Sequence, residues 1–209
     1  MSIAVVLLAT ALSAPRLTIT FDEQVNDRYP QWALHTDQSA GALVELVVNP
    51  QGRIESCVLL DSVGNARLAA EMCEETEGLR LRSATDTAGN PVYGKIRTLL
   101  RFSAQGNDDL SLVENSGEPN DLEVPLAQLP AAYPNGFVVE VDVLVDTEGS
   151  VQACDAAFQG PPPGFEPYIS QACERAGQLR LDPFTGSSDA AAPYVTRRRV
   201  RFKPESPRA

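Results

Sequence analysis

The four cysteines of this 209-residue chain are its most reactive side chains, and their spacing favours disulfides over redox or metal chemistry. No two of them form a C-x-x-C pair. Thioredoxin-like redox sites and zinc knuckles both need two thiolates at that close spacing. An even number of cysteines in an exported chain is available for pairing. We therefore predict disulfides among Cys57, Cys73, Cys154 and Cys173.

The remaining reactive groups do not form a recognisable catalytic set. His35 is the only histidine, so a histidine-dependent nucleophile could be assembled at only one place, and its context QWALHTDQS predicts a solvated loop or short helix. Adjacent carboxylates such as Asp22 and Glu23 point to different faces rather than across a shared substrate. There is no glycine-rich phosphate loop, metal-ligand spacing or nucleophile elbow. We expect no enzyme activity, no catalytic residues, no cofactor and no bound metal.

The elements that carry the cysteines occur twice in the chain. The stretch ALVELVVNPQGRIESC (residues 42–57) is matched by VEVDVLVDTEGSVQAC (residues 139–154), 97 positions later. After an insertion of three residues the offset becomes 100. Such self-similarity indicates a duplicated structural unit. The matched residues are Gly52 and Gly149, Cys57 and Cys154, Cys73 and Cys173, and Arg101-Phe102 and Arg201-Phe202.

Each copy has the periodicity of an α+β module. Apolar residues alternate over residues 42–48, which is typical of a half-buried strand, and a turn at Gly52 leads into a second strand ending near Cys57. Leu68 and Met72 then follow a helical spacing. A short strand at Leu79–Arg82 and a long final strand complete the unit. We predict two tandem α+β modules, each an antiparallel sheet with one helix packed on it.

In each predicted module one cysteine ends the second strand and the other lies on the inward face of the helix. A bond between them would tie the helix to the sheet. Closing a loop of this length contributes about 3 kcal/mol in the chain-entropy model, which matters for a module with a small core. Pairing within each copy gives Cys57–Cys73 and Cys154–Cys173. Crossed pairs between the copies and four free thiols are the alternatives.

The N-terminus and the middle of the chain set the domain boundaries. The apolar run from Ile3 to Leu12, followed by small residues and Pro15, predicts a signal peptide cleaved after Ala14; a buried first strand is the alternative. The run is shorter than the ~20 residues that cross a bilayer, so we expect no stable membrane span. The expected boundaries are a signal peptide at 1–14, a first module at 15–103, an acidic linker at 104–123, a second module at 124–204 and a tail at 205–209.

The charge distribution bears on possible partners. A net charge of −11 disfavours binding to nucleic acid and to anionic membranes. Six acidic residues and no Lys or Arg lie in residues 104–123, without the spacing of a calcium-binding loop. A basic cluster near the C-terminus is interpreted as a solvated strand face, with an anion-binding strip as the alternative. Its members are Arg197, Arg198, Arg199, Arg201 and Lys203.

The first copy resembles a known family. Tyr29-Pro30, an alternating strand, a turn glycine, a second strand, a helix and the closing Arg101-Phe102 resemble the C-terminal domain of TonB. The stretch LRLRSATDTAGNPVYGKIRTLLRF (residues 79–102) is similar to cysteine-containing TonB C-terminal-like proteins of some Gram-negative bacteria. The second copy lacks the A-T-D-x-x-G-x-P segment.

The resemblance implies a periplasmic, non-catalytic binding module that captures an extended peptide of an outer-membrane receptor or envelope protein by β-strand addition. The alternatives are an accessory component of TonB-type energy-coupled transport, and a structural envelope protein that forms homo-oligomers. The final strand of each copy is the candidate edge. Its residues are Tyr93, Arg97, Leu99 and Arg101 in the first copy, and Tyr194, Arg197, Arg199 and Arg201 in the second.

Overall fold

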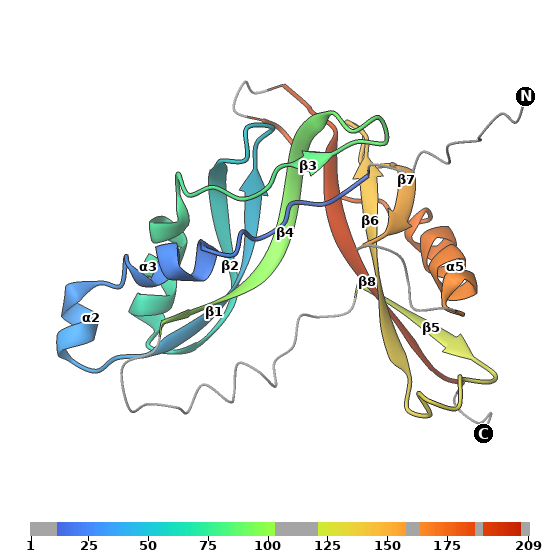
Figure 1. Cartoon of the computed structure of the whole chain (residues 1–209), viewed down its shortest axis with the longest axis horizontal. Coiled ribbons are helices and arrows are strands. Elements are labelled where there is room, and N and C mark those ends of the chain that lie inside the picture. Colours follow the sequence, from blue (N-terminus) through green and yellow to red (C-terminus); the bar gives the residue numbers. More distant parts are fainter. Residues whose placement is uncertain (1–11, 103–120, 158–163, 187–189, 206–209) are drawn as a thin grey trace, which may run out of the picture.

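The computed structural model describes residues 12–102, 121–157, 164–186 and 190–205, and shows an α+β protein with one sheet running through both halves (Figure 1). The α+β class is therefore confirmed. The pairing within the first half is antiparallel, as expected. In the second half the expectation fails at one pair, because β8 (Tyr194–Pro204) is parallel to β5 (Leu122–Leu126), and β8 is also parallel to β4 (Pro91–Phe102) where the halves join. Most of the expected signal peptide and of the acidic linker lies outside the described residues.

The first half begins with two short helices and continues as two strands, a helix and a final long strand. Its elements are α1 (Phe21–Asn26), α2 (Gln31–His35), β1 (Ala40–Val48), β2 (Ile54–Gly64), α3 (Ala66–Thr76), β3 (Ala84–Thr85) and β4 (Pro91–Phe102). Asn65 caps the start of helix α3, and its side-chain oxygen accepts the N–H of Leu68 at 3.0 Å. Strand β2 continues well beyond Cys57, where the sequence pattern placed its end.

The elements of the second half are β5 (Leu122–Leu126), β6 (Phe137–Val145), β7 (Val151–Ala156), α5 (Glu166–Ala176) and β8 (Tyr194–Pro204). From β6 onward the second half repeats the order of two strands, a helix and a long final strand, but it begins with a strand, β5, where the first half has α1 and α2. In the first half Leu46 lies opposite Cys57, and in the second half Val143 lies opposite Cys154. A register shift follows one residue later in both, at Val47/Val48 and at Leu144/Val145. The duplicated sequence thus forms hairpins with the same register.

Each half buries its own apolar core between sheet and helix. In the first half Val44, Leu46 and Val48 of β1 are fully buried in a cluster with Leu68 and Met72 of α3. In the second half Val141, Val143 and Val145 of β6 are fully buried in a cluster with Ala172 and Ala176 of α5. The apolar residues that alternate in the sequence therefore lie on the side of each sheet that faces the helix.

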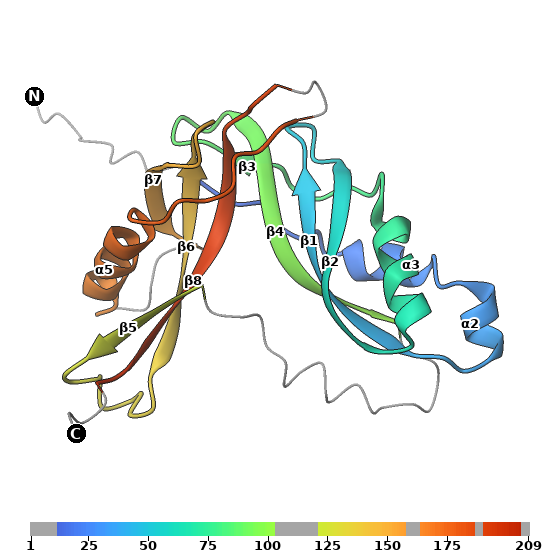
Figure 2. The ribbon, with the colours of Figure 1, turned by 180° about the vertical axis from the view of Figure 1, so that it is seen from behind.

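The halves join where β4 lies parallel to β8. Tyr93, Gly94 and Lys95 pair with Tyr194, Val195 and Thr196, giving the strand order β2-β1-β4-β8-β6-β7. Beyond these three pairs the two strands diverge (Figure 2).

The parallel pairing determines which face each helix covers. Ile96 of β4 packs in the α3 core, whereas Tyr194 of β8 packs in the α5 core. Directly paired residues point to the same face of a sheet, so Tyr194 points to the same face as its partner Tyr93. Side chains alternate along a strand, and Tyr93 therefore points to the face opposite to that of Ile96. The two helices consequently cover opposite faces of the shared sheet.

A third, small core lies at this junction. It contains Leu12, Ala14, Ala84 and Val195, all buried. The segment Leu12–Arg16, which we call the N-terminal strap, contributes the first two and contacts both halves.

Candidate functional site

Both predicted disulfides are present. Cys57 of β2 is bonded to Cys73 of α3, and Cys154 of β7 is bonded to Cys173 of α5. Each bond ties a helix to the outermost strand of its own half. These cysteines therefore serve the fold, as the sequence indicated.

The two final strands lie inside the sheet and not at its borders, which corrects the expectation that both are edges. The outermost strands are β2 and β7. Tyr93 and Tyr194 face each other at the junction, and Tyr194 is 1% exposed with its hydroxyl donating to the Asp182 carbonyl at 3.0 Å. Burial raises the pKa of Tyr194 above its usual value. The sequence pattern missed this arrangement because backbone pairing between two strands leaves no signature in the side chains of either.

Strand β8 has neighbours along both sides. On the side away from β6, β5 pairs in parallel with Val200–Pro204, beyond the stretch that pairs with β4. Its predicted edge residues are engaged within the fold: Arg197 Nε donates to Asp142 Oδ1 at 2.9 Å, and Arg199 Nε lies 3.7 Å from Glu140 Oε1. Arg197, Arg198, Arg199 and Lys203 of the basic cluster thus lie beside carboxylates, whereas Arg201 is exposed. The candidate edge in the second half is accompanied by β4 and β5.

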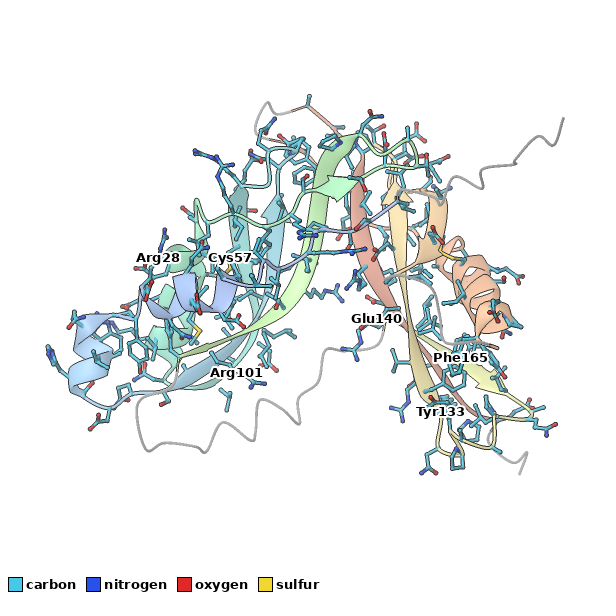
Figure 3. All side chains as sticks on the ribbon, in the orientation of Figure 1. Arg28, Cys57, Arg101, Tyr133, Glu140 and Phe165 are labelled. Atoms are coloured by element: carbon cyan, nitrogen blue, oxygen red, sulfur yellow. A yellow bond between two sulfur atoms is a disulfide. The ribbon has the colours of Figure 1, made fainter. Side chains whose placement is uncertain are left out.

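Strand β4 differs, because its far part has a strand neighbour on one side only. Residues 94–102 pair with β1, but on the opposite side β8 accompanies β4 only as far as Lys95. Within the described part of the chain no strand lies beside Ile96–Phe102 on that side, and we call this stretch the β4 open edge. It contains three of the predicted edge residues, Arg97, Leu99 and Arg101. Arg101 is labelled in Figure 3.

A pocket of about 290 Å³ adjoins the β4 open edge. One wall is Leu99–Arg101, and the other is α1, through Asp22, Val25 and Asn26. At the repeat offset of 100, Leu99–Arg101 correspond to Arg199–Arg201 of β8. That stretch of β8 is accompanied by Asp121, whose N–H donates to the Arg199 carbonyl, and by Leu122 and Glu123 of β5. The pocket therefore adjoins the part of β4 whose counterpart in β8 has β5 beside it.

A second pocket, of about 350 Å³, lies at the junction and is lined by charges that pair with one another. Asp121 Oδ1 accepts from Arg97 Nη1 at 2.9 Å and from Arg198 Nη1 at 3.1 Å. Arg97 Nε also lies 3.4 Å from Glu45 Oε2. Since Arg97 belongs to β4 and Arg198 to β8, Asp121 links the halves. Asp121 lies in an acidic run of the sequence, and the composition of that run predicts a linker.

The other groups considered from sequence lie apart from these pockets. His35 is exposed at the end of α2. In residues 12–102, 121–157, 164–186 and 190–205, no three His, Cys, Asp or Glu side chains are grouped so as to hold a metal ion. The same ranges contain no helix with the length and apolarity needed to cross a membrane.

The sequence pattern did not predict α1, β3 and β5. Each is at most six residues long, too short for a clear period. The alternation of Leu122, Val124 and Leu126 was the one available signal for β5, and Pro125 weakened it. Comparison with family models, with curated proteins and with solved structures found no match to this chain.

Proposed function

We propose that this protein is a non-catalytic periplasmic binding protein that captures an extended peptide by adding it as a strand to the β4 open edge. The peptide would belong to an outer-membrane receptor or another envelope protein, as the resemblance to the TonB C-terminal domain implies. Unpaired backbone groups at a strand edge can hydrogen-bond an incoming strand, and neighbouring pockets select its side chains.

The observation that carries this proposal is that β8, the counterpart of β4, already has an added strand. Strand β5 is connected to β6 through residues 127–136 and lies parallel to β8 over five residue pairs. Val124 is 3% exposed within the core, and the Glu123 carboxylate pairs with Lys203 Nζ. In effect, the second half binds a strand of its own at the position where the described residues of the first half place none.

Strand β5 also indicates the chemistry of the ligand. Leu122, Glu123 and Val124 lie opposite Val200, Arg201 and Phe202. At the repeat offset these positions of β8 correspond to Leu100, Arg101 and Phe102 of β4. The ligand expected at the β4 open edge is therefore a strand parallel to β4, with an acidic residue beside Arg101 and an aliphatic residue on either side of it.

The test is a titration of the isotopically labelled chain with the synthetic peptide DLEVPL, which copies Asp121–Leu126, and with N-terminal peptides of outer-membrane receptors. We expect backbone amide shifts concentrated in β4 at Ile96–Phe102 and in α1. Shifts confined to the outer strands β2 and β7, or no shifts at all, would contradict the proposal.

Arg101→Glu should weaken binding of DLEVPL several-fold, because it places like charges opposite each other. The matched control is Arg53→Glu, the same charge change at an exposed position in the β1–β2 turn. A peptide with Lys in place of Glu should bind more tightly to Arg101→Glu than to the unchanged chain. Equal binding by all three proteins would remove Arg101 from the site.

Assembly of identical copies is a second candidate, favoured by a specific feature of β2. This outermost strand exposes three consecutive apolar side chains, Val58, Leu59 and Leu60, at 53%, 37% and 45%. Light scattering of the purified chain over a range of concentrations distinguishes this structural role from peptide capture. The accessory role in energy-coupled transport remains an alternative that would require a membrane-embedded partner.

A further inference from the structure

The pocket at the junction of the halves, which we call the junction pocket, carries an excess of positive charge. Of the described residues that line it, four are cations and three are carboxylates. The cations are Lys95, Arg97, Arg180 and Arg198. A single negative charge inside the pocket would balance the charges of this lining. The junction pocket therefore favours an anion over a neutral or cationic occupant.

Lys95 is a cation of the junction pocket that has no carboxylate partner. Its Nζ lies 4.7 Å from the centroid of the Tyr194 ring and 5.5 Å from that of Phe184. Among the residues that the structure describes, none forms an ion pair with Lys95, whose side chain is half-buried. Aromatic faces attract an ammonium group but leave its net charge in place. Lys95 can therefore pair with an anion in the pocket.

Arg198 lacks hydrogen-bond acceptors at a buried position. It is 6% exposed, and its Nη1 donates to Asp121 Oδ1 at 3.1 Å. The same oxygen also accepts from Arg97 Nη1 at 2.9 Å. Nε of Arg198 is buried and finds no acceptor within the described part of the chain, which is unfavourable for a donor. A carboxylate accepts two parallel hydrogen bonds from one edge of a guanidinium, here Nε and Nη2.

Lys95 and Arg198 reach the junction pocket from neighbouring strands and from the same face of the sheet. Lys95 is paired directly with Thr196, and Arg198 lies two residues further along β8. Paired residues point to the same face, and so do residues two apart in a strand. One carboxylate can consequently contact the ammonium and the guanidinium together.

Neither of these two charges is required by the repeated fold. At the offset of 100, Lys95 corresponds to Val195 and Arg198 corresponds to Thr98. Both counterparts are buried, with Val195 at 0% and Thr98 at 7% exposure. Each final strand thus forms with a neutral side chain at the position where the other has a cation. The two cations therefore belong to the junction pocket and not to the architecture of the module.

Apolar side chains make up another part of the lining. Leu60 of β2 is 45% exposed, and Leu179 and Leu181 follow α5. The volume of about 350 Å³ lies at the lower end of the range of about 300–1,000 Å³ for small-molecule sites. Charged and apolar walls in so small a space suit an anion with a short aliphatic part.

We propose that the junction pocket binds a small organic monoanion, a carboxylate that carries a short aliphatic group. The carboxylate lies between Lys95 and Arg198 and balances the charge of the lining. The aliphatic group lies against Leu60. This site is separate from the β4 open edge, and the proposal does not depend on peptide capture there.

The test is a titration of the isotopically labelled full chain, with intact disulfides, against sodium hexanoate. We expect saturable shifts of the Arg198 Nε–H and of the backbone amides of Lys95 and Leu181. Acetate should bind several-fold more weakly, because it lacks the aliphatic chain. No saturation at ~10 mM hexanoate, where even a millimolar site is occupied, would overturn the proposal. The same shifts with neutral hexanol, or binding of inorganic phosphate alone, would also overturn it.

Lys95→Met tests the charge, because it removes the ammonium and keeps an apolar side chain over the Tyr194 ring. It should weaken hexanoate binding several-fold and leave binding of DLEVPL unchanged. The matched control is Lys203→Met, the same change at a lysine that pairs with Glu123. Equal hexanoate affinities of the two variants would contradict a role for Lys95.

Leu60→Ser tests the apolar wall and should lower the affinity for hexanoate several-fold but not that for acetate. Val58→Ser is its control, since Val58 is 53% exposed on the same strand and is not among the described residues that line the pocket. Equal hexanoate affinities here would remove Leu60 from the site. Arg101→Glu, which weakens peptide capture, should leave hexanoate binding unchanged, so that failure of one proposal is distinguishable from failure of the other.

Discussion

Asp146 and Asn49 are counterparts in the repeat, and each accepts backbone hydrogen bonds in its hairpin turn. The acceptor is a carboxylate at Asp146 and a neutral amide at Asn49. Asp146 Oδ1 accepts the N–H groups of Glu148 and Ser150, both at 2.8 Å. Asn49 Oδ1 accepts those of Gln51 and Arg53, at 3.0 and 2.9 Å. Hydrogen bonding, led by the Ser150 amide, holds the pKa of Asp146 below its ordinary value of 3.8.

This difference predicts an acid sensitivity confined to the second turn. Because the carboxyl pKa of Asp146 is lower in the folded chain than in the unfolded one, its contribution is fully present above pH 3.8 and is lost as the pH falls through the folded-state pKa. Asp146→Asn should narrow the difference between the urea midpoints at pH 7 and pH 3. Asn49→Asp should widen it. Unchanged pH profiles in both variants would show that the two turns do not contribute.

At the scale of the element, each hairpin turn contains a glycine against which the chain packs after the helix. Gly52 and Gly149 have φ of +78° and +83°. The N–H of Leu81 donates to the Gly52 carbonyl at 2.8 Å, and that of Leu181 donates to the Gly149 carbonyl at 2.9 Å. A Cβ at either glycine would collide with the carbonyl oxygen of the same leucine. The glycine thus fixes where the segment after the helix returns to the sheet.

Gly149→Ala should consequently destabilise the protein by about 2–4 kcal/mol, combining the left-handed backbone with the collision. Gly78→Ala is the matched control, because Gly78 has φ of +75° but no atom within 4 Å of the position of a Cβ. It should lose only about 1–2 kcal/mol. Chemical denaturation measures both. Equal losses of unfolding free energy in the two variants would mean that the collision with Leu181 does not contribute to the effect.

Elements with a clear period could be predicted from the sequence, and elements that depend on distant partners could not. In β1 and β6 the alternating apolar residues are the buried ones, and around Met72 the residues at helical spacing are buried. Burial therefore determines these patterns in the sequence. The short strand expected at Leu79–Arg82 is instead a pair of isolated bridges, to Arg53 and Arg16. One of those partners, Arg16, lies in the strap, far from Arg82 in the sequence.

At the scale of the whole molecule, Asp121 connects the halves near the point where β4 and β8 part. In addition to its bonds with Arg97 and Arg198, its Oδ2 accepts the N–H of Arg199 at 2.8 Å. The Arg198 side chain is only 7% exposed, so it depends on this carboxylate for compensation of its charge. Composition alone assigned Asp121 to a linker, because its partners are distant in sequence.

Asp121→Asn should lower the free energy of unfolding by about 1–3 kcal/mol, since the amide keeps an acceptor for Arg199 but loses the charge that compensates two guanidinium groups. Glu123→Gln is the control, because it removes a neighbouring carboxylate whose pair with Lys203 is exposed, and it should change little. Urea denaturation compares the two. Indistinguishable midpoints would show that Asp121 does not stabilise the junction.

The order of strands has a consequence for stoichiometry. Strand directions from β2 to β7 run up, down, up, up, down, up, so the two outermost strands point the same way. Copies meeting through β2 alone would pair antiparallel about a two-fold axis and stop at two. If β7 of one copy paired with β2 of the next, the two strands would be parallel. Each added copy would offer a further free border, so the assembly would grow into a fibre. Which border of the sheet is used would therefore decide between a closed dimer and an endless ribbon.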